Sequence, residues 1–73
     1  MFYTVLEIQQ MQNGAKACVP YIFDSYDEAL AKLYTILAAA AISNIPYHAA
    51  FVLRDDGVLT DGKVFDKRVL NQG

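Results

Sequence analysis

The side chains best suited to covalent chemistry in this sequence are its single cysteine, Cys18, and its single histidine, His48. A cysteine nucleophile needs a histidine within hydrogen-bond reach, which the positions of the two residues along the chain do not establish. Cys18 lies within the apolar stretch AKACVPYIF, where a free cysteine usually acts as a small buried hydrophobic side chain. The sequence therefore predicts a structural cysteine and no Cys–His catalytic pair.

Aspartates gather around a predicted hairpin late in the chain, at Asp55, Asp56, Asp61 and Asp66. Their spacing differs from that of an EF-hand loop, so we expect them to serve turns and solubility. A structural zinc site needs about four ligands, more than the Cys and His of this chain supply. The scattered glycines form no phosphate-binding loop. We therefore expect no enzyme activity, no cofactor and no metal site.

Tyrosines are numerous, with five in 73 residues. Tyrosine favours interfaces and ligand clefts because its ring is apolar and its hydroxyl group forms hydrogen bonds. Tyr21 and Tyr47, together with His48, are therefore the candidate ligand contacts. For Tyr34, filling a small core is at least as good an interpretation.

Five secondary-structure elements would position these side chains. We expect strands at residues 2–10, 15–23, 47–54 and 58–66, and a helix from residue 25 to about residue 43. Asn13-Gly14 and Asp56-Gly57 are typical of hairpin turns, and Pro20 favours an edge strand or a bulge. The order predicts an α+β fold, a two-layer ββαββ domain over residues 1–73, with one helix packed on one face of a four-stranded antiparallel sheet.

Alternation along two of the strands predicts which side chains share a face. In the first strand, Phe2, Thr4, Leu6 and Ile8 take one face and Tyr3, Val5, Glu7 and Gln9 take the other. In the third strand, Tyr47, Ala49, Phe51 and Leu53 share a face. Because the first strand begins with apolar side chains on both faces, we expect both faces to be covered there.

The helix has clear start and stop signals. Ser25 and Glu28 fit a capping box at its beginning, while Asn44 could adopt a left-handed cap before Pro46 ends the helix. The spacing of apolar residues predicts a stripe that faces the core. That stripe consists of Leu30, Leu33, Tyr34, Leu37 and Ala41.

The run TILAAAAISN leaves the rest of the helix almost uncharged. Either alanine is present simply as the best helix former, or its small side chains let a second chain approach closely. We favour the second interpretation. The predicted interface consists of Ala38, Ala39 and Ile42 on the helix and Tyr3 and Val5 on the first strand.

Composition also indicates self-association. Hydrophobic residues make up 55% of the chain and charged residues only 19%, against about 25% charged in a typical domain. A chain of 73 residues has a marginal core and usually needs a disulfide, a metal or a partner. A homo-oligomer, most simply a dimer, is therefore the expected assembly.

Charge and hydropathy narrow the range of other partners. A net charge of −2 argues against a nucleic-acid binder. The longest uncharged apolar stretch is too short to cross a bilayer, and the first residues do not resemble a signal peptide. We expect a cytoplasmic protein without a membrane partner, and a protein or small-molecule ligand remains open.

The segments MFYTVLEIQ and AKLYTILAAAAISNIPYHAAFVL, together with the final hairpin, resemble a family of short uncharacterised open reading frames from phages and prophages of gut bacteria. That family has no established activity, so it supplies no functional residues. The resemblance implies a protein that acts by binding in the cytoplasm of a bacterial host. It would be an antagonist of host defence that inhibits a protein or sequesters a ligand, or else an accessory protein of virion structure or assembly.

Overall fold

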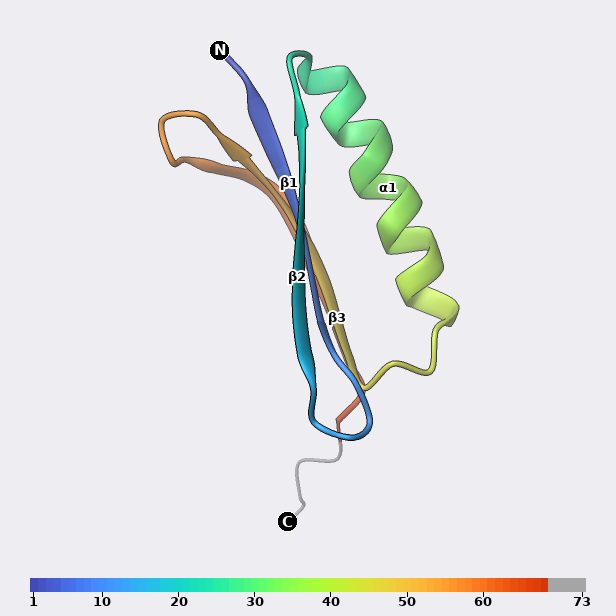
Figure 1. Ribbon diagram of the computed structural model, residues 1–73. Helices are drawn as coiled ribbons and strands as arrows, with labels where there is room; N and C mark the ends of the chain where they lie inside the picture. The colour runs from blue at the N-terminus through green and yellow to red at the C-terminus, as the bar shows by residue number, and fades with distance from the viewer. Residues whose placement is uncertain (69–73) are drawn as a thin grey trace.

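The structure, a computed structural model, describes residues 1–68 and contains one antiparallel sheet and one helix (Figure 1). The elements follow the order ββαββ, as the sequence predicts. They are β1 (Tyr3–Gln10), β2 (Lys16–Phe23), α1 (Tyr26–Ile42), β3 (Tyr47–Arg54) and β4 (Leu59–Asp66). The α+β prediction is confirmed, while residues 69–73 of the predicted domain lie outside the described part.

The sheet has the strand order β2-β1-β3-β4, so β1 and β3 are central and β2 and β4 form its edges. All three pairings are antiparallel. Pro20 therefore lies on an edge strand, where its missing N–H costs little. Strand β4 runs without interruption through Asp61 and Gly62, and the register of its pairing with β3 shifts between Val52 and Leu53.

The helix begins as predicted and ends differently. The Ser25 hydroxyl accepts a hydrogen bond from the backbone N–H of Glu28 (3.4 Å), which confirms the N-cap. At the other end the cap is Ser43 in an extended conformation, in place of a left-handed Asn44. The backbone N–H of Ser43 donates to the carbonyl oxygen of Ala40 (3.3 Å), and Nζ of Lys67 donates to the carbonyl oxygens of Ala40 and Ala41 (3.4 Å each). The cap and a lysine distant in sequence therefore share the last turn.

The core lies between α1 and one face of the sheet. It consists of Val5, Ala29, Leu33, Ile36, Ala50 and Val52. The predicted helix stripe is partly wrong, because Tyr34 is 60% exposed and Ala41 is exposed, while Ala29, Ile36 and Ala40 are buried. Ala29, Leu33 and Ile36 face the strands, and the large Tyr34 ring points to solvent.

Candidate interaction surface

One face of the sheet carries no helix, and alternation along the strands decides which side chains it presents. The register places its residues in four rows across the sheet. In the order β2, β1, β3, β4, the rows are Lys16, Gln10, Tyr47 and Asp66; Cys18, Ile8, Ala49 and Val64; Pro20, Leu6, Phe51 and Gly62; and Ile22, Thr4, Leu53 and Leu59. We call this surface the open face.

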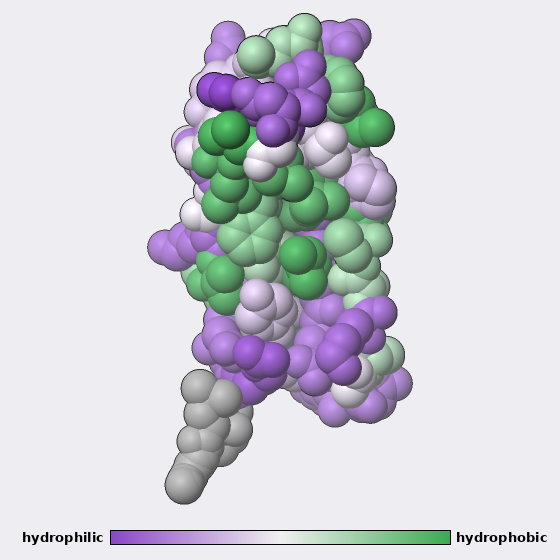
Figure 2. All heavy atoms as spheres, turned by 90° about the vertical axis from the view of Figure 1, so that its left-hand side faces the viewer, coloured by the Kyte–Doolittle hydropathy of each residue, from purple (hydrophilic) through white to green (hydrophobic). Residues whose placement is uncertain are grey.

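The open face is apolar over most of its length. Charged side chains occur only in its first row, at Lys16 and Asp66, and the other three rows consist of apolar residues with one threonine and one glycine. Ile22 is 68% exposed, and Leu59 and Val64 are also exposed. Figure 2, which views the molecule from this side, shows a continuous hydrophobic area with hydrophilic groups at its two ends.

Gly62, on the edge strand β4, leaves space on the open face for the side chain of its neighbour on β3. The ring of Phe51 lies against the α-carbon of Gly62, so that a side chain at position 62 would collide with it. The Phe51 ring therefore fills the space that a side chain on β4 would otherwise take. A shallow, even surface results, which suits packing against another flat surface.

The Arg68 side chain covers the polar end of this face. Its guanidinium lies 4.6 Å from the centre of the Tyr47 ring and donates to Asp66 (2.7 Å) and to the side-chain oxygen of Gln10 (2.9 Å). The hydrogen bonds from Arg68 hold the pKa of Asp66 below its ordinary value. Asp66 is therefore charged at neutral pH.

Cys18 belongs to the open face and is exposed. The sequence predicts a buried cysteine, and this prediction is wrong because β2 is an edge strand whose side chains on this face have no layer above them. His48 lies on the opposite face of the sheet, so the sheet separates the two residues. The structure does not bring them together as a nucleophile and its base.

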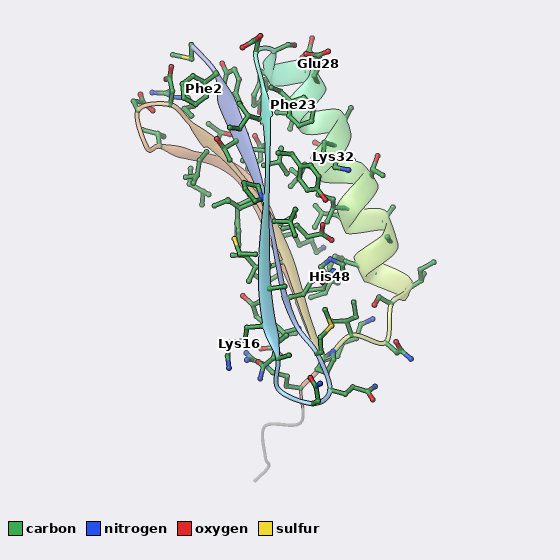
Figure 3. All side chains as sticks on the ribbon, viewed as in Figure 1. Phe2, Lys16, Phe23, Glu28, Lys32 and His48 are labelled. Atoms are coloured by element: carbon green, nitrogen blue, oxygen red, sulfur yellow. The ribbon has the colours of Figure 1, made fainter. Side chains whose placement is uncertain are left out.

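The covered face holds a cluster of polar side chains beneath the second half of the helix, at His48 (Figure 3). His48 is 4% exposed, and its Nε2 lies 2.7 Å from Oε2 of Glu7. The other oxygen of Glu7 accepts a hydrogen bond from the Tyr21 hydroxyl (3.3 Å), and Gln9 Nε2 donates to Oε2 (3.2 Å). Desolvation is the largest cause that raises the pKa of Tyr21, and the charge and hydrogen bond of Glu7 raise it further.

The hydrogen-bond partners of His48 determine its neutral tautomer. A proton on Nε2 can be donated to the Glu7 carboxylate, whereas Nδ1 is buried and has no partner among the described residues. A neutral His48 with its proton on Nε2 therefore leaves only a lone pair unsatisfied, which costs less than burying an unpaired N–H. The sequence does not predict this cluster, because alternation along the strands does not determine which face of the sheet the helix covers.

The structure does not gather the predicted contact residues in one place. Tyr21 and His48 lie on the covered face and Tyr47 on the open face. Within the predicted interface, Ala38, Ala39 and Ile42 lie on exposed parts of the helix. Tyr3 packs against the core, and Val5 is completely buried inside its own chain, away from any outer surface.

Residues 1–68 contain no pocket and no group of three His, Cys, Asp or Glu side chains that could hold a metal. None of the helical residues among them form a segment long and apolar enough to cross a membrane. Comparisons with protein-family models, with curated proteins and with solved structures find no match for this chain.

Proposed function

We propose that this protein is a non-enzymatic binding protein that acts as a homo-oligomer. The observation that supports the proposal is the apolar open face. Four strands of eight residues each form it, and the usual strand and residue spacings give it a flat area of ~500 Å². The largest apolar patch on a soluble monomer covers about 300–600 Å² and is often functional, so a face of this size is a candidate interaction site.

The chemistry of this surface also favours binding over catalysis. Apart from Lys16 and Asp66 in the end row, its side chains offer apolar area and few groups that could transfer a proton or hold a charged substrate. Such a face stabilises a complex by removing apolar area from water. The partner is then a protein surface of similar character.

The resemblance to short phage and prophage reading frames supports a setting for this binding activity. In that setting the protein acts in the cytoplasm of an infected bacterium and antagonises host defence. Expression of the protein alone in a defended host should then let phage grow. Recovery of the protein in purified phage particles, without any such protection, would assign it to the virion instead.

Native mass spectrometry over a range of protein concentrations tests the proposal at the molecular level. A homo-oligomer should dominate at micromolar concentration and dissociate on dilution. Any additional small-molecule mass in the oligomer would identify a ligand. A monomer at every concentration would refute the homo-oligomer.

A further inference from the structure

We infer that the open face of the sheet is covered by a second copy of this chain, packed face to face with it in a two-fold symmetric dimer. This inference rests on the proposed homo-oligomer and names its interface. It also moves the interface from the alanine run of the helix, where the sequence places it, to the opposite side of the molecule.

The area of the open face is sufficient for such a dimer. Two faces of ~500 Å² each bury ~1,000 Å² between them, which is about the least that a specific interface needs. Side-chain relief adds to this flat estimate. Sheets that pack face to face do so at about 10 Å, with the side chains of both inner faces forming one shared core.

The outer face of the helix offers less to a partner than the open face does. Four of the ten exposed residues of α1 are alanines, which bury little apolar area, and its larger exposed apolar side chains are Tyr26, Tyr34 and Ile42. The open face presents leucine, isoleucine, valine and phenylalanine on neighbouring strands. Because burial stabilises in proportion to apolar area, the sheet contact is the stronger of the two.

The order of the rows decides how the two copies are oriented. A two-fold axis that runs along the strands places each row over the same row of the other copy, with the strand order reversed. The end row then meets itself, and Lys16 of one copy lies over Asp66 of the other, twice by symmetry. An axis across the strands would instead place Lys16 over the apolar row that contains Ile22, where its ammonium group would be desolvated without a carboxylate partner.

Two isoleucines form a matched pair for the test. Ile22 on the open face is 68% exposed and Ile42 at the end of the helix is 90% exposed, so lysine at either position leaves the core of the single chain intact. In the face-to-face dimer, Ile22→Lys places two ammonium groups in an apolar interface. We expect it to raise the dimer dissociation constant at least about tenfold. Ile42→Lys should leave the constant unchanged.

Cys18 provides an independent reading of which face is covered. It lies on the open face beside Ile8, so dimerisation should slow its alkylation by iodoacetamide as protein concentration passes the dissociation constant. Circular dichroism of each variant establishes that it is folded. The orientation is read in an Arg68→Gln background, which leaves Asp66 without its own cation. There Lys16→Glu should weaken the dimer at low salt by opposing Asp66, while Lys16→Arg should not.

Each outcome separates the two proposals. A dimer with protected Cys18 that Ile22→Lys dissociates and Ile42→Lys does not supports the assigned interface. A dimer whose Cys18 reacts at the monomer rate, or which Ile42→Lys dissociates, overturns that interface and keeps the homo-oligomer. A protein that stays monomeric at every concentration overturns both the homo-oligomer and the assigned interface. If Cys18 is protected only when a different protein is added, the open face is not covered by a second copy of this chain. No effect of Lys16→Glu overturns the axis along the strands.

Discussion

The buried pair of Glu7 and His48 leads to a prediction about variants that remove one or both partners. The changes are Glu7→Met, His48→Leu and the double variant, each of which keeps a side chain of similar size. If Glu7 and His48 mainly offset the cost of burying each other's polar atoms, removing Glu7 alone should lower the free energy of unfolding more than removing both side chains. The double variant should therefore be more stable than the Glu7→Met variant.

The contacts in the cluster set the expected magnitudes. Glu7→Met leaves Nε2–H of His48 without its acceptor at 2.7 Å, in a ring whose Nδ1 already lacks a partner. We expect the free energy of unfolding to fall by about 2–3 kcal/mol. His48→Leu leaves Glu7 with its hydrogen bonds from Gln9 and Tyr21, so the loss should be about 1 kcal/mol. Replacing both should come within about 1 kcal/mol of the unmodified protein.

Urea unfolding followed by circular dichroism measures these differences. All variants need the same protein concentration, because dimer formation makes apparent stability depend on concentration. Gln9→Met serves as the comparison within the cluster. Gln9 Nε2 lies 3.2 Å from both Glu7 Oε2 and His48 Nε2, but the residue is half-buried, so its loss should cost less than that of Glu7. A double variant less stable than Glu7→Met would refute the reasoning, since the two side chains would then each stabilise the fold independently.

Three further predictions concern the core, the helix cap and the tyrosine beside Glu7. Leu33→Ala should lower the free energy of unfolding in urea by about 2–5 kcal/mol, because Leu33 is among the largest completely buried side chains. Ser25→Ala removes the acceptor for the N–H of Glu28 and should lower it by about 1 kcal/mol, seen as a lower thermal midpoint. Tyr21 should ionise above the ordinary tyrosine pKa, and Glu7→Gln should move that pKa part of the way back. Because folding raises the pKa of Tyr21, its hydroxyl group contributes stability that is fully present below pH ~10 and is lost as the pH rises through the folded pKa. An absorbance titration of the protein beside its Tyr21→Phe variant measures this pKa.

Local signals in the sequence were sufficient for the secondary structure. Turns at Asn13-Gly14 and Asp56-Gly57 are confirmed by glycines with φ near +90° (88° and 86°), a conformation that glycine adopts without strain. The N-cap at Ser25 is likewise confirmed, because a cap depends on a few neighbouring residues. The predicted cap at Asn44 is wrong for the opposite reason. The cap is Ser43, and Lys67, which is distant in sequence, reaches the carbonyl oxygens of Ala40 and Ala41 only through the fold.

Alternation also predicted which residues of β1 and β3 share a face, since successive side chains of a strand point to opposite sides. It left open which of the two faces receives the helix. The face with Leu6, Ile8, Phe51 and Leu53 is the more apolar, yet α1 packs on the face that carries Glu7 and His48.

That choice was decided by tertiary packing. Ala29, Leu33 and Ile36 of α1 pack over Val5, Ala50 and Val52. The single helix fills this face with its own apolar stripe, and the apolar side chains of the other face have no helix above them. The sequence determined that this protein has more apolar surface than one helix can cover, because one helix buries a single stripe. Only the tertiary structure determined that the surplus lies on the open face of the sheet and not on the helix.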